Sequence, residues 1–175
     1  MIMPPTLRKF ALTLHVTSSV GLLGSIAAFL ALAIIGLNSA DDQVLRSVYP
    51  AMQLIARFVI VPLAIAALLT GMIQSLGTAW GLFHHYWVVM KLLLMAFATT
   101  ILLIKMALIS ESARLAFEAI IPRAELRDAG LQLMVHAAGG LFVLLLPMVL
   151  SIYKPQGLTR YGWRKQQAKL SMAKP

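Results

Sequence analysis

Histidine side chains placed in or beside long apolar segments are the groups of this sequence best suited to chemistry. The four histidines are His15, His84, His85 and His136, and the chain contains no cysteine. Neutral imidazole nitrogens bind haem iron, copper and zinc, so a histidine site remains open, whereas thiolate ligands and cysteine nucleophiles are excluded. His15, His85 and His136 are the candidate metal ligands.

Lysines in the third apolar segment share a helical face with one of these histidines. His84, Lys91 and Lys105 are separated by multiples of seven residues, which is close to two helical turns. Two interpretations stay open: the ammonium groups snorkel to the membrane interface, or they bind a carboxylate or phosphate inside the bundle. Arg57 and His136 add polar groups to other segments, and with Lys105 they could form a second polar cluster.

The stretch "HHYWVVMK", residues 84–91, combines two histidines with aromatic residues and a lysine. Tyrosine and tryptophan favour the headgroup layer of a membrane, so an interfacial collar is one interpretation. A ligand site in which His84 or His85 meets His15 is the other. Adjacent residues on a helix point in different directions, so only one of the two histidines would enter such a site.

The elements that must hold these residues are membrane-spanning helices. Hydrophobic residues make up 60% of the chain, charged residues only 12%, and the mean hydropathy is +0.85. Soluble domains have about 45–50% apolar and about 25% charged residues. Each of four apolar segments exceeds the roughly 20 residues that a helix needs to cross a bilayer. The predicted spans are about 10–37, 50–76, 86–109 and 131–153.

The sequence therefore predicts an all-α fold, a four-helix transmembrane bundle in a single domain, 1–175. The first segment is expected to be a retained helix, because its apolar run is longer than that of a signal peptide. Pro62 should kink the second span. The connection at 38–49 is expected to be a loop, and the connection around Pro122 should hold one or two short interfacial helices.

The placement of charged residues predicts that both termini are cytoplasmic. Basic residues are more numerous on the side of the termini, as the positive-inside rule requires of a cytoplasmic face. That side has Arg8, Lys9, Lys154, Arg160, Arg164, Lys165, Lys169 and Lys174; the other has Arg46, Arg114, Arg123 and Arg127. The basic, aromatic tail 154–175 should contact anionic lipid headgroups rather than nucleic acid.

Small and polar residues form a stripe along the first span. His15, Ser18, Gly21, Ser25 and Ala28 recur at spacings of three and four, so they share one face. Small residues allow close helix packing. The stripe therefore predicts a packing face with one hydrogen-bonded histidine or, alternatively, room for a flat cofactor beside His15.

Two sequence patterns resemble known families. The "WGLFHHYWVxxK" stretch and the "YKPxGxTxYGxRK" ending resemble an uncharacterised family of bacterial integral membrane proteins over most of the chain. That resemblance implies a multi-pass protein of the bacterial inner membrane and no known activity.

A weaker likeness links the chain to the copper-resistance protein D membrane domain and to the haem-containing, four-helix type of protoporphyrinogen oxidase. It consists of a histidine early in the first span, "P…LTG" in the second, and an aromatic residue followed by lysine in the third. The resemblance implies haem or copper binding by His15 and, less directly, by Lys91. The oxidase type has an aromatic-rich stretch where this chain has "VTSSVGLLG".

Three functional hypotheses follow, and none assigns a catalytic residue, since no nucleotide-binding or hydrolase motif is present. The first is a non-catalytic accessory component that packs with itself or with a membrane complex. The second is a haem b redox protein that uses His15 with His84 or His85. The third is a carrier or binder of an anionic or lipid-like molecule that uses Arg57, Lys91 and Lys105.

Overall fold

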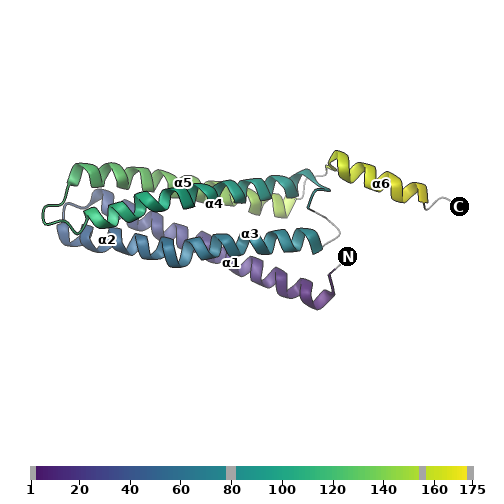
Figure 1. Ribbon diagram of the computed structural model, residues 1–175, viewed down its shortest axis with the longest axis horizontal. Coiled ribbons are helices and arrows are strands. Elements are labelled where there is room, and N and C mark those ends of the chain that lie inside the picture. Colours follow the sequence, from purple (N-terminus) through teal and green to yellow (C-terminus); the bar gives the residue numbers. More distant parts are fainter. Residues whose placement is uncertain (1–2, 78–81, 154–156, 173–175) are drawn as a thin grey trace.

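The computed structural model describes residues 3–77, 82–153 and 157–172, with only the backbone described at 166 and 168–170 (Figure 1). The described chain is helical throughout apart from short connections, and the predicted all-α bundle is confirmed. Its helices are α1 (Pro5–Asn38), α2 (Asp42–Ile55), a π-helical turn η1 (Ala56–Ile60), α3 (Val61–Gly77), α4 (Tyr86–Leu115), α5 (Arg123–Tyr153) and α6 (Arg160–Met172).

Four helical stretches are long and apolar enough to cross a membrane. They are α1, the continuous run Asp42–Gly77, α4 and α5. Large apolar side chains such as Phe10, Phe58 and Phe142 are exposed on the outside of the bundle, where a soluble protein would place polar groups. The chain is therefore a multi-pass membrane protein.

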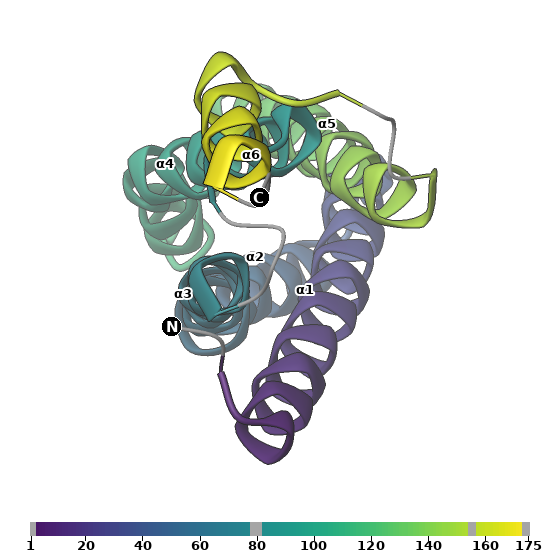
Figure 2. The same cartoon turned by 90° about the vertical axis from the view of Figure 1, so that its right-hand side faces the viewer.

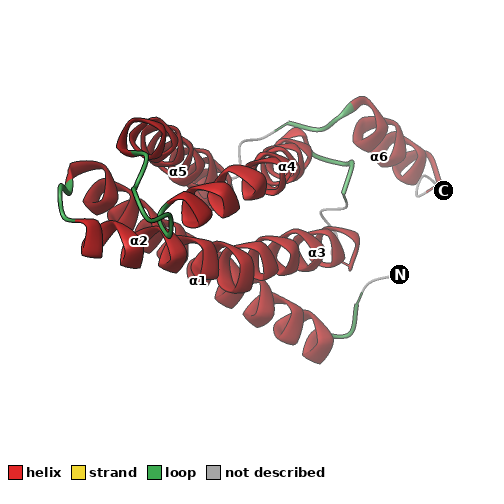
Figure 3. Cartoon of the chain, turned by 60° about the vertical axis from the view of Figure 1, so that its left-hand side comes forward, coloured by secondary structure: helices red, strands yellow, loops and turns green. Residues whose placement is uncertain are grey.

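The four spans form a ring of neighbours. α1 packs against α3 on one side and α5 on the other, and α4 closes the ring against α5 and α3 (Figure 2). α6 projects beyond one end of this bundle (Figure 3). We call that end, where α1 and α4 begin and α3 and α5 finish, the open end, and the opposite end the closed end. The N- and C-terminal parts of the bundle thus lie at the same end.

The best-packed core lies at the closed end, around Tyr49 and Met52 of α2, which are 1% and 0% exposed. The Tyr49 hydroxyl donates a hydrogen bond to the Leu126 carbonyl oxygen over 3.1 Å. A side chain at Gly130 would place its Cβ only 2.5 Å from that hydroxyl. The absence of a side chain at Gly130 therefore leaves room for the end of the Tyr49 ring, which reaches from α2 to the backbone of α5.

The second span begins earlier than predicted, because most of the expected loop 38–49 belongs to α2. Asp41 caps the helix by accepting a hydrogen bond from the Gln43 amide over 2.8 Å. Four apolar residues at helical spacing then bury one face against the core: Leu45, Val48, Tyr49 and Met52. The charged residues that suggested a loop occupy the other face.

The predicted disturbance at Pro62 takes the form of the π-helical turn η1 just before it. Proline has no amide hydrogen and its ring crowds the carbonyl four residues earlier, here that of Phe58. The chain widens at this point, and the Val61 amide donates to the Ala56 carbonyl five residues back. The helical run continues through this turn from Asp42 to Gly77.

The prediction of separate interfacial helices around Pro122 was wrong. α4 continues to Leu115 and α5 begins at Arg123, with only a short turn between them. Charged side chains pair at the end of α4: Arg114 contacts Glu111 in the same helix at 2.6 Å and Glu118, just beyond its end, at 3.0 Å. Such pairs three and four residues apart stabilise a helix.

A basic cavity as candidate functional site

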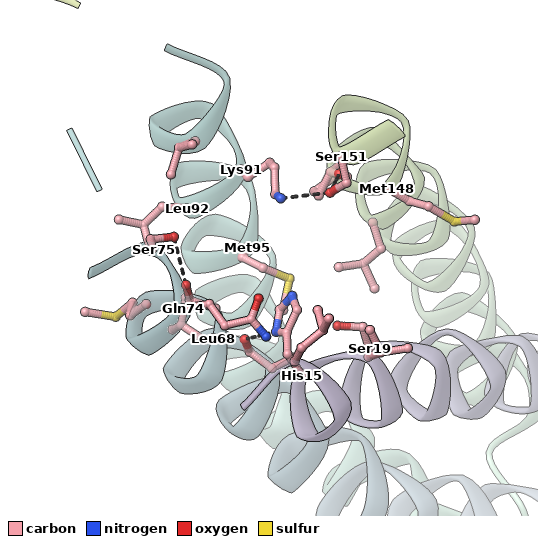
Figure 4. A pocket seen from close by; sticks show the side chains of 18 of the residues that line it. His15, Ser19, Leu68, Gln74, Ser75, Lys91, Leu92, Met95, Met148 and Ser151 are labelled. Carbon is pink, nitrogen blue, oxygen red and sulfur yellow. Dashed lines mark hydrogen bonds between the residues drawn. The ribbon is translucent and has the colours of Figure 1, made fainter. Parts of the chain in front are cut away.

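A cavity of about 830 Å³ opens inside the bundle at the open end, between α1, α3, α4 and α5. Its volume lies within the roughly 300–1,000 Å³ range of small-molecule sites. Most of its wall is apolar. The polar lining residues are Arg8, Lys9, His15, Ser19, Gln74, Ser75, Lys91 and Ser151 (Figure 4).

His15 is held in the cavity wall by α3. Its Nδ1 lies 3.1 Å from the Ala67 carbonyl oxygen and 3.1 Å from the Thr70 hydroxyl oxygen. The Thr70 hydroxyl in turn donates to the Ala66 carbonyl over 2.6 Å. A carbonyl can only accept, so this network assigns the proton to Nδ1. In the neutral ring the lone pair is then on Nε2.

Gly71 provides the space that the His15 ring occupies. A Cβ at residue 71 would lie 3.1 Å from Cε1 of His15, which is tighter than an ordinary contact. The ring of His15 therefore lies directly on the backbone of α3. Gln74, one turn further along, donates from Nε2 to the Ala11 carbonyl over 2.8 Å and joins the same two helices again.

Lys91 reaches across the cavity from α4 to α5. Its Nζ donates to the Ser151 hydroxyl over 2.8 Å, and that hydroxyl donates to the Pro147 carbonyl over 2.7 Å (Figure 4). The ammonium also lies 5.1 Å from the centre of the Trp87 ring, within cation–π range. Lys91 therefore lies in the cavity wall.

Positive charge in the cavity is not balanced by carboxylates. Arg8 and Lys9 line it beside Lys91 and His15, and no aspartate or glutamate is among the described lining residues. All six acidic residues lie at the closed end, on the α1–α2 connection and where α4 meets α5: Asp41, Asp42, Glu111, Glu118, Glu125 and Asp128. A cavity lined by one sign of charge, with apolar walls, focuses its field on a ligand of opposite charge.

Three predicted polar residues do not line this cavity: Arg57, Lys105 and His136. Arg57 is exposed on η1, with its guanidinium 5.9 Å from the Phe58 ring centre. Lys105 shares the helical face of Lys91, but it lies 14 positions further along α4, a distance of roughly 21 Å. His136 is exposed on α5, where its Nδ1 lies 2.6 Å from the Gln132 carbonyl.

His84 and His85 also lie outside the cavity lining, so the structure does not place them with His15. Both belong to a segment that holds the start of the tail. The Thr159 amide donates to the His84 carbonyl over 2.9 Å, and the His84 and Tyr161 rings meet edge to face with centres 5.4 Å apart. His85 forms a β-bridge with Leu158 and precedes the first residue of α4.

We call these contacts between residues 83–86 and 157–162 the tail clasp. Its tightest point is Gly162, where a Cβ would collide with the His84 carbonyl oxygen. Thr159 caps the start of α6, accepting a hydrogen bond from the Gly162 amide over 3.0 Å. "HHYWVVMK" thus has two roles: its histidines belong to the tail clasp, and Trp87, Val88 and Lys91 line the cavity.

In the described part of the chain, no three His, Asp or Glu side chains come together in a group that could hold a metal ion. The three candidate ligands lie in different surroundings: His15 in the cavity, His85 in the tail clasp and His136 on the exposed face of α5.

Several lining residues were missed by sequence reasoning, chiefly Gln74, Ser75 and Ser151. All three are polar residues within two turns of the end of an apolar span, where side chains of this kind are common. Their helical spacing alone does not distinguish a cavity wall from an interface. The unusual pairing of Gln74 with Ser75 late in the second span is the one local signal that could have suggested it.

Comparison with protein-family models, curated proteins and solved structures found no match. Fold and site together define a multi-pass helical membrane protein with a basic cavity inside the bundle.

Proposed function

We propose that this protein binds an amphipathic anion in the cavity at the open end. One observation carries the proposal: Arg8, Lys9, His15 and Lys91 line a largely apolar cavity that contains no described carboxylate. A cation within a membrane-spanning segment is costly, so such a residue has a functional role by default. An anionic ligand would complement the positive charge of these residues.

Lys91 is the centre of the proposed site. It contributes charge and an N–H donor, and Ser151 and Trp87 hold it at the mouth of the cavity. Arg8 and Lys9 are exposed there and would attract the ligand from the aqueous side. The site binds and orients; we assign it no catalytic step. This is the third of the sequence hypotheses, with Arg57 and Lys105 placed outside it.

The proposal is tested by thermal stability in lipid nanodiscs of neutral phosphatidylcholine. A single-chain anion such as laurate should raise the melting temperature of the protein, because a ligand that binds only the folded state stabilises it. The matched zwitterionic amphiphile dodecylphosphocholine should not. Equal effects of the two probes would contradict the proposal.

We further propose that the open end faces the cytoplasm of a bacterial cell, in the inner membrane. The larger number of lysines and arginines at this end supports that orientation. A reporter enzyme fused after Pro175 should be active only in the cytoplasm. Activity in the periplasm would reverse the orientation of the cavity.

The tail helix α6 fits a position at the lipid headgroups. Tyr161 and Trp163 are exposed, and Arg160, Arg164 and Lys165 lie on the same short helix. Aromatic and basic residues together favour an anionic membrane surface. Of the predicted basic tail, 154–156 and 173–175 lie outside the described residues, and so do Lys154 and Lys174.

Haem b is a second candidate ligand, favoured by the hydrogen bond of His15. Histidines that bind iron usually donate their other nitrogen to a carbonyl, as Nδ1 of His15 does to Ala67, which leaves Nε2 for the metal. Lys91, Arg8 and Lys9 suit two propionates. Such a haem would have His15 as its protein ligand without His84 or His85, and would add redox chemistry to the site.

The haem candidate is tested by an absorption spectrum of protein purified from haem-replete cells. A Soret band that is lost in His15→Ala and kept in His136→Ala would support it, and no band in the wild type would contradict it. The likeness to the copper-resistance and oxidase groups stays a prediction, and the same spectrum tests the haem binding that it implies.

The accessory hypothesis remains a prediction, but its main sequence argument has changed. The small-residue stripe on α1 is used in part inside the bundle: His15 packs on α3, and a Cβ on Gly21 would lie 3.2 Å from the Leu63 side chain. Co-purification of a membrane partner under gentle extraction would support this hypothesis.

A further inference from the structure

The exposed part of the described cavity lining lies on α1 and α5. Among the lining residues, those exposed at the surface all belong to these two helices. They are Arg8, Lys9, Leu12, Val16 and Val20 on α1, and Met148 and Ile152 on α5. Lining residues on α3 and α4 are buried or half-buried. α3 and α4 therefore form the closed wall, and α1 and α5 frame an opening.

The arrangement of the helices explains this opening. α1 and α5 are neighbours in the bundle. At the open end, however, the start of α1 swings away from the end of α5 (Figure 2). We call the gap framed by Val16 and Val20 on one side and Met148 and Ile152 on the other the side opening. These four side chains are 49%, 63%, 52% and 66% exposed.

The side opening suits contact with lipid better than contact with water. Its frame is apolar, and Val16, Val20 and Met148 lie within the stretches that span the membrane. A molecule that enters here must already be dissolved in the hydrocarbon layer. A small hydrophilic anion would not reach this flank, because the apolar core of a bilayer has no partners for its charge.

The cavity lining changes from charged to apolar along α1. Arg8 and Lys9 line it at the open end, and Leu22 and Leu23 line it deeper in the bundle. From Arg8 to Leu23 the distance along the helix axis is roughly 22 Å. Leu144 of α5 also lines the cavity and is buried. Charge at the membrane surface and an apolar channel below it match a lipid with one acidic head and one chain.

We propose that the side opening between α1 and α5 admits a single-chain lipid anion from the bilayer. Its acidic head contacts Lys91 and its acyl chain lies between Leu22 and Leu144. This inference rests on the proposed anion site and names the class of its ligand and its route of entry. Lys91 is hydrogen-bonded to Ser151, which is the neighbour in sequence of Ile152 at this opening.

Tryptophan fluorescence tests the inference, because Trp87 lines the cavity and is only 9% exposed. A Trp80→Phe/Trp163→Phe variant leaves Trp87 as the single tryptophan. In liposomes of neutral phosphatidylcholine, a brominated long-chain fatty acid should quench Trp87 saturably. A brominated lysophosphatidylcholine, which has the same chain but no net charge, should give only weak, linear quenching.

Variants at the side opening test whether the fatty acid enters the cavity through it. In the same background, Val16→Phe/Met148→Phe should slow the onset of fatty-acid quenching by roughly tenfold, because bulkier side chains narrow the entrance. The control Leu131→Phe/Val135→Phe adds the same bulk to exposed positions outside the cavity and should change nothing. Met148→Phe alone replaces the double variant if that one fails to fold.

A water-soluble anion distinguishes the inference from the function on which it rests. Butyrate should stabilise the protein weakly, through Lys91, and equally in the Leu131→Phe/Val135→Phe control. Stabilisation by butyrate without saturable fatty-acid quenching would overturn the lipid inference and leave the anion site standing. An unchanged rate of fatty-acid quenching in Val16→Phe/Met148→Phe would overturn the route. No response to either anion would overturn both proposals.

Discussion

The ring of His15 lies on the backbone of Gly71, so close that a Cβ at residue 71 would stand 3.1 Å from Cε1. The Ala67 carbonyl of the same helix accepts a hydrogen bond from Nδ1–H of His15 over 3.1 Å. α3 therefore determines both where the imidazole lies and which nitrogen has the lone pair. The cavity depends on this relationship, because His15 forms part of its wall.

Gly71→Ala should displace His15 by a few tenths of an ångström and weaken its hydrogen bond to Ala67. We expect a loss of stability of about 1 kcal/mol and weaker binding of laurate, because the ring must move into the cavity. Thermal unfolding with and without laurate measures both effects. Gly24→Ala is the matched control, since a Cβ there meets nothing within 4 Å. Equal behaviour of the two variants would contradict this relationship.

Lys91→Gln should lower the affinity for laurate by roughly tenfold or more, as expected for loss of a hydrogen bond to a charged group. Glutamine keeps a donor for Ser151 but removes the charge. Lys105→Gln, on the same face of α4 and outside the cavity, should bind laurate like the wild type. Laurate titrations in nanodiscs provide the comparison. Equal losses in both variants would indicate a general effect of net charge.

Gly162→Ala should open the tail clasp, because the added Cβ collides with the His84 carbonyl. The hydrogen bond from the Thr159 amide to that carbonyl should break, so this amide should exchange its hydrogen faster. Hydrogen exchange followed by mass spectrometry of residues 157–165 measures the change. Gly157→Ala serves as control, because its Cβ would make an ordinary 3.8 Å contact with Tyr86. Unaltered exchange in Gly162→Ala would show that the clasp is not formed.

Tyr49→Phe should destabilise the closed end by about 1 kcal/mol, because the Leu126 carbonyl loses its buried donor. The cavity lies at the other end, so laurate affinity should stay unchanged. Thermal unfolding in detergent measures the stability, with the exposed Tyr153→Phe as control. Equal stability of Tyr49→Phe and Tyr153→Phe would show that the Tyr49 hydrogen bond does not stabilise the core.

The spans were predictable because lipid imposes a simple rule: long apolar runs must be helical. The start of α2 was not, since the charges around Asp42 suggested a loop, whereas Asp41 caps a helix whose apolar face is buried. The length of α4 was missed for a related reason, because the pairs made by Arg114 support a helix where polar composition suggested a break.

The candidate site was predictable only in part. His15 and Lys91 stand out because charge and imidazole are rare in apolar spans, and both line the cavity. The role of His84 was not predictable, since its partners Thr159 and Tyr161 lie more than 70 positions away in the chain. No local pattern signals such a contact. Helical phase correctly grouped Lys91 with Lys105 but could not reveal that only the first lines a cavity.

Direct detection of bound lipid tests the central claim most simply. Native mass spectrometry measures the mass of the intact protein after its release from nanodiscs. These nanodiscs contain equal amounts of palmitate and lysophosphatidylcholine. The account predicts one palmitate per chain on the wild type and on Lys105→Gln, and loss of that adduct in Lys91→Gln. Equal retention of the two lipids, or palmitate retained without Lys91, would contradict it.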